Sequence, residues 1–172
     1  MFRIKKKTPN VNPYFITNEE ISHLNELEVE IHFDAEADEF WSFACTLRST
    51  SVGNKSTWYA IDRKSGIILA WHNGKRKDKD FLVLWCLLAN FPITRYYTDN
   101  WGSYSKYIPA GRHRTGKDNT WKIERKNLNF RTHLKRLTRK SICFSKNEQI
   151  HDNVIGMYIE RCYYRTGTYG NN

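Results

Sequence analysis

The order of the apolar patterns between residues 27 and 99 is the feature that most restricts the fold. Strand-like alternation over 27–33 comes first, and further strand-like runs follow at 37–47, 58–61 and 67–71. The last two are joined by the tight turn Asp62–Gly66. We therefore predict a strand over 27–33 and a three-stranded antiparallel meander over 37–71.

A helix and one more strand follow the meander. Phe81, Leu84, Leu88 and Phe91 recur at helical spacing after the acidic start 78–80, and Pro92 stops the pattern. The run 93–99 is then a strand that ends in a carboxylate, Asp99. A strand, a helix and a strand in this order predict a parallel crossover with Asp99 at the carboxyl end of its strand. The expected class is α/β, with a mixed sheet flanked by helices.

The basic residues are concentrated in one segment, 112–146. It holds twelve Lys/Arg and two acids, so its net charge of +10 equals that of the whole protein. A positive electrostatic field this concentrated favours binding to a polyanion, and the common polyanion is nucleic acid. Glu124 is the exception, because a carboxylate repels phosphate unless a metal ion lies between them.

Helical periodicity continues through 121–140, the core of that basic segment. Ile123, Phe130, Leu134 and Leu137 form its apolar stripe, with Asn127 on the same side, and Glu124 lies at the edge of the stripe. A shorter helix is expected around 150–158.

Composition limits the class of protein. The chain of 172 residues is 40% hydrophobic and 15% aromatic, which suits one globular domain over 27–160 with a basic and polar lead-in, 1–26, and a flexible tail, 161–172. Neither a signal peptide nor a membrane span is expected, which predicts a cytoplasmic protein. The four widely spaced cysteines, Cys45, Cys86, Cys143 and Cys162, are expected to be core residues and not zinc ligands.

Three acids occupy positions that suit a metal site: Asp38 on a meander strand, Asp99 at a strand end, and Glu124 on a later helix. Sixty residues lie between the first two and twenty-four between the last two. Mg²⁺ takes oxygen ligands, and two such ions support phosphoryl displacement. Each acid alone has a plain reading as a turn or surface residue, and three other acids near Asp38 are rival ligands: Asp34, Glu36 and Glu39.

The segments around these acids resemble a known family. Residues 37–41, 98–104 and 123–131, with further similarity over 134–146 and 151–156, are similar to the blocks around the acidic triad of the insertion-sequence-one type of DDE transposase. The resemblance covers roughly residues 27 to 160. It implies a ribonuclease-H-like domain that nicks and joins DNA at transposon ends.

By position, the resemblance implies that Asp38, Asp99 and Glu124 are the catalytic and metal-binding residues, with two Mg²⁺ or Mn²⁺ ions as cofactors. It also suggests DNA contacts from a histidine and four basic residues: His113, Arg125, Arg131, Lys135 and Arg139. The aromatic residues near Asp99 are candidates for stacking on unpaired bases, with packing against the sheet as the alternative: Tyr96, Tyr97, Trp101, Tyr104 and Tyr107.

Family members also carry an upstream DNA-recognition region with a zinc finger and a helix-turn-helix, joined by translational frameshifting. This chain resembles the second reading frame. The expected partners are therefore the transposon ends, target DNA, further copies of the chain on DNA, and that upstream reading frame. A nuclease of the same fold that only cuts, and an inert DNA-binding remnant or regulator, remain the alternatives.

Overall fold

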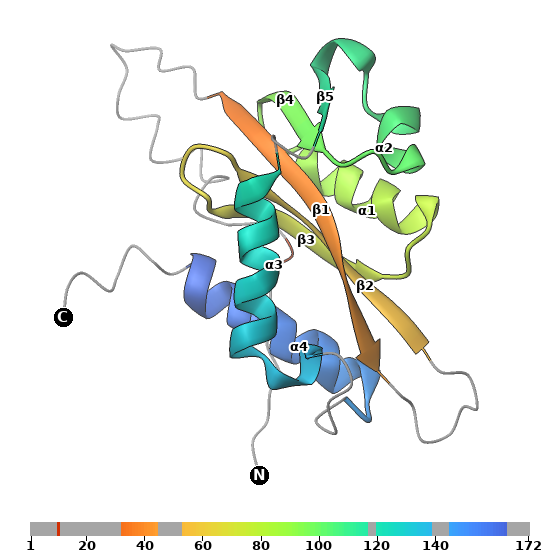
Figure 1. Cartoon of the computed structure of the whole chain (residues 1–172), viewed down its shortest axis with the longest axis vertical. Helices are drawn as coiled ribbons and strands as arrows, with labels where there is room; N and C mark the ends of the chain where they lie inside the picture. The colour runs from red at the N-terminus through yellow and green to blue at the C-terminus, as the bar shows by residue number, and fades with distance from the viewer. Residues whose placement is uncertain (1–9, 11–31, 45–52, 117–119, 139–144, 165–172) are drawn as a thin grey trace, which may run out of the picture.

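The computed structural model describes residues 10, 32–44, 53–116, 120–138 and 145–164. Five strands form one sheet: β1 (Phe33–Ala44), β2 (Gly53–Asp62), β3 (Ile68–Gly74), β4 (Ile93–Thr98) and β5 (His113–Thr115). Four α-helices accompany them: α1 (Asp78–Leu88), α2 (Gly102–Tyr107), α3 (Trp121–His133) and α4 (Glu148–Ile159). Figure 1 shows α3 and α4 crossing one face of the sheet and α1 on the other.

The sheet is mixed, with the strand order β3-β2-β1-β4-β5. β1 pairs antiparallel with β2, and β2 antiparallel with β3, which confirms the predicted meander. β4 lies parallel to β1 on its other side, which confirms the crossover through α1. This arrangement is the α/β architecture expected of a ribonuclease-H-like domain.

Each face of the sheet has its own apolar core, because side chains alternate along a strand. On the α1 face, Trp58 and Ala60 pack with Phe81 and Leu84. The other face, under α3 and α4, is built around Phe40, Tyr59, Ile123, Phe130 and Ile155. The central strands are buried from both sides, so charged residues on them are held in place by contacts with the helices.

The predicted break between two strands before residue 37 is wrong. β1 runs without interruption from Phe33 to Ala44, and Glu36 in its middle is fully buried. One oxygen of its carboxylate accepts the Ile123 N–H, and the other lies 3.7 Å from Arg63 without a hydrogen bond among the described residues. Residues 27–31 of the predicted strand 27–33, and residues 45–47, lie outside the described residues.

The helix predicted over 121–140 ends earlier, at His133. The backbone of Leu134 leaves the helical region, and a 3-10 turn, Lys135–Leu137, still buries Leu137 against the core. A different backbone conformation thus buries the same apolar residue. β5, a three-residue strand parallel to β4, was not predicted.

The short C-terminal helix is confirmed. Asn147 caps α4 by accepting a hydrogen bond from the Ile150 N–H, and a π-helical turn, Glu160–Tyr164, continues it. Cys86 is exposed on α1, so the expectation that it is a core residue is wrong, while Cys162 is half-buried. Among the described residues, no helix has both the length and the apolar character needed to cross a membrane.

Candidate active site

The sheet register brings Asp38 and Asp99 to the same level. In the parallel pair, Glu36 of β1 lies opposite Tyr97 of β4. Continuing this register by two residues on each strand places Asp99, directly after β4, beside Asp38. The Asp99 carboxylate accepts a hydrogen bond from the Trp101 N–H at 2.9 Å, which holds it at the strand end.

Polar contacts with β1 and β2 fix the start of α3, where Glu124 lies. The Glu36 carboxylate accepts the Ile123 N–H at 3.0 Å. The Asn127 side chain donates to Asp38 Oδ2 at 2.7 Å and accepts from the Tyr59 hydroxyl at 2.7 Å. Because these contacts flank Glu124 on both sides, they set its position relative to Asp38.

The carboxylates share one electrostatic environment. Burial raises the pKa of Asp38 to about 6, and the negative charges of Asp99 and Glu124 add to this, against hydrogen bonds from the Glu39 backbone and Asn127 that lower it. Burial and the charges of Asp38 and Asp99 likewise raise the pKa of Glu39 to about 7, partly offset by Arg76. The charges of neighbouring acids therefore act on both Asp38 and Glu39.

These acids do not form a closed ligand cluster. In the described part of the chain, no three His, Cys, Asp or Glu side chains are grouped closely enough to hold a metal ion as they stand. Glu124 is exposed and accepts a hydrogen bond from the Thr120 hydroxyl at 3.3 Å. Asp38 and Asp99 are partly buried.

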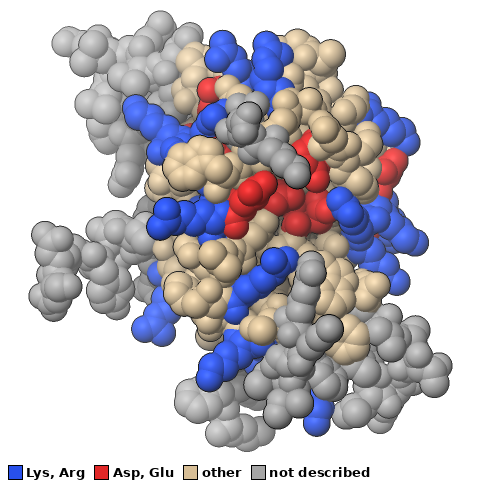
Figure 2. Space-filling view, viewed as in Figure 1, with Lys and Arg blue, Asp and Glu red and all other residues tan. Residues whose placement is uncertain are grey.

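A groove of about 600 Å³ opens beside Asp38 and Asp99. Its lining combines the acids with basic, polar and aromatic side chains: Asp38, Glu39, Trp41, Asn54, Ser56, Lys75, Arg76, Lys77, Asp99 and Arg131. Figure 2 shows acidic side chains gathered in the middle of one face with Lys and Arg around them. An anionic chain could thus be held by the basic residues while one of its groups meets the acids.

The predicted DNA-contact residues are spread over the site. Arg131 lines the groove, and its Nε is buried without a hydrogen-bond partner among the described residues. Arg125 is exposed on α3, and Lys135 lies in the 3-10 turn after that helix. Arg139 lies outside the described residues.

His113 has a contact of its own, at the start of β5. Its Nε2 lies 2.7 Å from the Thr98 hydroxyl, which itself donates to the Asp99 carbonyl at 2.8 Å. Since that hydroxyl has already used its proton, Nε2 is the donor and Nδ1 is left as an acceptor. Burial and the Arg114 charge lower the pKa of His113. The structure thus assigns His113 a role in supporting the strand end that carries Asp99.

Most of the aromatic residues near Asp99 are packed. Tyr96 and Tyr104 are buried, and Trp101 stacks on Trp58 with ring centroids 4.9 Å apart. The Tyr107 hydroxyl donates to Asp78 at 3.1 Å. These residues therefore pack within the protein, which was the alternative to stacking on unpaired bases.

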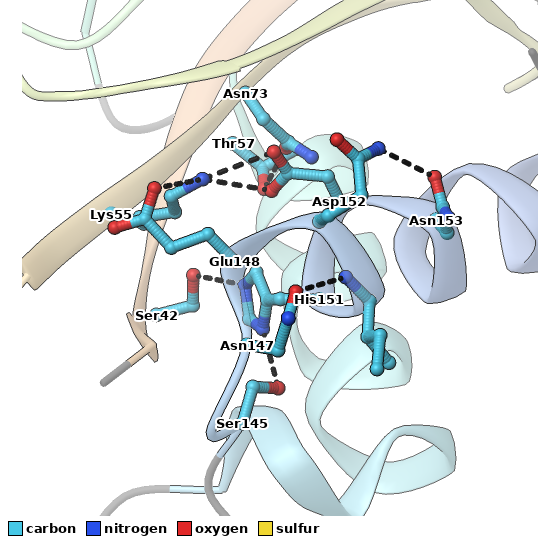
Figure 3. Close-up of polar contacts among 12 residues, drawn as sticks. Ser42, Lys55, Thr57, Asn73, Ser145, Asn147, Glu148, His151, Asp152 and Asn153 are labelled. Carbon is cyan, nitrogen blue, oxygen red and sulfur yellow. Dashed lines mark hydrogen bonds and ion pairs between the residues drawn. The ribbon is translucent and has the colours of Figure 1, made fainter. Parts of the chain in front are cut away.

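A second polar cluster anchors α4 to the sheet (Figure 3). The buried His151 lies between two hydroxyls, with Nε2 2.9 Å from Ser42 and Nδ1 2.8 Å from Ser145. Lys55 of β2 pairs with Asp152 at 3.0 Å. Burial lowers the pKa of His151 to about 4, so the ring is neutral at pH 7 and acts as a structural link.

Sequence reasoning missed several residues of this region. From the sequence, Glu36 and Glu39 are only rivals of Asp38, and Asn127 is only a position beside an apolar stripe. The run 75–77 carries three consecutive basic residues, which was the available signal for the second wall of the groove.

Comparisons with a family model and with individual proteins point to the same family. Residues 31–165 match the family model described as IS1 transposase. The chain is 45% identical over 130 residues to the insertion element iso-IS1n protein InsB of Shigella dysenteriae, covering 73% of this chain and 93% of that protein. It is 38% identical over 135 residues to the insertion element IS1 protein InsB of Shigella flexneri, covering 76% of this chain and 97% of the relative. An InsB protein of Escherichia coli (strain K12), from insertion element IS1 4, is also 38% identical over 135 residues, with 76% of each chain covered. With this fold, and with a family model that matches most of its length, the chain belongs to the IS1 transposase family.

Proposed function

We propose that this chain is the catalytic domain of a metal-dependent DNA transposase, with Asp38, Asp99 and Glu124 as its catalytic residues. The observation that carries the proposal is the junction of β1, β4 and α3. The strand register sets Asp99 level with Asp38, and the Asn127 contact to Asp38 holds α3 so that the charge of Glu124 acts on Asp38. Family membership supports a role in transposition.

The donor groups fit Mg²⁺ or Mn²⁺, because all three candidate ligands are carboxylates and hard cations prefer oxygen. The Asp38 carboxylate accepts hydrogen bonds from the Asn127 side chain and the Glu39 backbone, and its two oxygens have about four lone-pair sites, so it keeps the capacity to bind a metal ion. Two bound ions would supply activation of a water or 3′-hydroxyl and stabilisation of the leaving oxygen. The chain's own residues hold the ions and orient the phosphodiester.

In this proposal, DNA is the substrate at two stages. Water first cleaves a phosphodiester at the end of the insertion sequence and releases a 3′-hydroxyl, which then attacks a target phosphodiester and displaces another 3′-oxygen. Basic residues of the 112–146 segment hold the backbone, with Arg125, Arg131, Lys135 and Arg139 as contacts and His113 close to Asp99. We further propose a cytoplasmic protein that acts as a homo-oligomer on DNA, together with an upstream DNA-recognition reading frame.

The test uses the purified chain and a supercoiled plasmid that carries the DNA flanking its own gene. With Mg²⁺ or Mn²⁺ we expect nicking and joined products, and with EDTA neither. Asp99→Asn and Glu124→Gln should abolish both products while DNA binding persists. Glu160→Gln removes a carboxylate from the helical turn after α4, outside the proposed site, and should leave both products unchanged.

The outcomes separate the alternatives. Nicks without joined products would favour a nuclease of the same fold, and binding without any metal-dependent product would favour a DNA-binding remnant. Full activity of Asp99→Asn would refute the assignment of the three catalytic acids.

A further inference from the structure

A second basic surface faces the acids, from a part of the chain outside the 112–146 segment. The connection between β3 and α1 carries Lys75, Arg76 and Lys77, and all three line the groove beside Asp38 and Asp99. Arg131 of α3 lines the same groove. Within this lining, four cations meet three carboxylates, so the groove attracts phosphate despite the acids at its floor.

Arg76 is oriented by its neighbours. Its Nε lies 2.6 Å from the Glu39 carboxylate, and its guanidinium carbon lies 5.4 Å from the ring centroid of Trp101. The side chain remains 53% exposed, whereas that of Glu39 is 7% exposed. A guanidinium has five N–H donors in a planar fork, so the Glu39 contact leaves the Nη groups able to bind a phosphate.

The backbone of this connection is also fixed. The Trp58 indole N–H donates to the Lys75 carbonyl at 3.0 Å, and the Lys77 N–H donates to the same carbonyl at 2.9 Å. The nearest acids of α1 have other partners: Asp78 pairs with Lys106 at 2.8 Å, and Asp80 with His72 at 3.4 Å. Lys75 and Lys77 are exposed and line the groove, so their charges are accessible to an external ligand, at a lower ordering cost than a free loop would incur.

Arg131 of α3 lines the same groove and has an unsatisfied donor. Its Nε is buried, and no described residue accepts a hydrogen bond from it. A buried donor without a partner is costly, and a rotation of the side chain toward an anionic oxygen in the groove would remove that cost. This observation is independent of the charges on the β3–α1 connection and points to the same ligand.

We propose that Lys75, Arg76 and Lys77 form a phosphate clamp that, with Arg131, holds the backbone of one DNA strand and presents one of its phosphodiesters to Asp38 and Asp99. The inference rests on the proposed function for the identity of the strand as DNA. The clamp itself binds phosphates and needs neither metal nor cleavage.

The experiment measures DNA binding in EDTA by fluorescence anisotropy, with a labelled single-stranded oligonucleotide and its duplex, over a range of salt concentrations. The test protein carries Lys75→Gln, Arg76→Gln and Lys77→Gln. The matched control carries Lys64→Gln, Arg95→Gln and Arg161→Gln, which remove the same charge from exposed positions that neither line the groove nor belong to the 112–146 segment.

Each lost phosphate contact lowers the slope of log affinity against log salt by about 0.7 for single strands. We expect the clamp variant to lose about 2 from this slope on the single strand, and the control to lose less than about 0.7. Arg76→Lys keeps the charge and should keep the slope. Lys75→Gln with Lys77→Gln leaves the Glu39 pair intact, and should lower the slope by about 1.4 even if the Arg76 variant folds poorly.

Equal slopes for clamp and control variants would overturn the clamp, whatever the result of the cleavage assay. If duplex binding alone depended on the clamp residues, the claim that the clamp holds one strand by itself would be overturned. A lowered slope combined with full cleavage by Asp99→Asn would support the clamp and refute the proposed catalytic residues. A wild-type chain that binds neither oligonucleotide would refute both the clamp and the proposed function.

Discussion

The contact between Glu36 and α3 gives the most direct test of how the site is held together. Glu36 is fully buried on β1, and its carboxylate accepts the N–H of Ile123, next to Glu124. It also lies 3.7 Å from the Arg63 guanidinium. Glu36→Ala removes the acceptor, leaves the Ile123 N–H without its partner and opens a small cavity in the core.

The expected loss of stability follows from these contacts. A hydrogen bond to a charged group contributes about 1.5–3 kcal/mol, while relief of the desolvation cost of a buried carboxylate offsets part of it. We expect Glu36→Ala to lower the free energy of unfolding by about 2 kcal/mol, measured by urea denaturation with circular dichroism and an unchanged m-value.

Glu36→Gln is the matched control, since its amide oxygen can still accept the Ile123 N–H. It should cost about 1 kcal/mol or less, because a neutral hydrogen bond replaces a charged one. If Glu36→Ala is as stable as the wild type, the contact does not hold α3. If the two variants lose the same stability, the charge and not the acceptor is responsible.

Two further variants test the packing around the site. Burial lowers the pKa of His151 from its ordinary value of 6.5 to about 4 in the folded chain, so the unfolded chain binds more protons between these pH values. Stability should fall by up to about 3 kcal/mol as the pH drops from 6.5 to 4, and urea titrations of His151→Gln over that range should show a flatter dependence. A Cβ at Gly74 would clash with the Asp80 side chain, so Gly74→Ala should cost about 1–3 kcal/mol in the same unfolding assay, whereas unchanged stability would show that Asp80 moves freely.

The sheet topology could be predicted because its signals are local. The turn Asp62–Gly66 and the alternation on either side of it encode the β2–β3 hairpin, and the spacing of Phe81, Leu84 and Leu88 encodes the crossover helix. Once the crossover is known, parallel pairing places Asp99 beside the strand that carries Asp38. The mixed sheet and the proximity of these two acids therefore followed from the pattern and order of the elements.

The remaining features depend on contacts between distant residues. In the sequence Glu36 is only one of several acids near Asp38, and its contact with the N–H of Ile123, 87 residues later, has no local signal. In the same way Asn127 is one position of a helical stripe in the sequence, but in the structure it bridges Tyr59 and Asp38. The Arg76 side chain is oriented by its ion pair with Glu39, and no spacing in the sequence predicts that contact.

The end of α3 shows the limit of periodicity. The apolar spacing from Ile123 to Leu137 is helical throughout, yet the helix stops at His133. A 3-10 turn satisfies the burial of Leu137 as well as a continued helix would. Hydrophobic spacing records which residues are buried, and more than one backbone can bury them.

The central claim is that Asp38, Asp99 and Glu124 belong to one metal site, and Mn²⁺ binding measures it most directly. Electron paramagnetic resonance titration of the folded chain should show bound Mn²⁺, with affinity lost or reduced at least about ten-fold in Asp38→Asn, Asp99→Asn and Glu124→Gln, because each removes a charged oxygen ligand. Glu160→Gln should bind as the wild type does. Wild-type affinity in any of the three site variants, with the fold intact by circular dichroism, would contradict the claim for that residue.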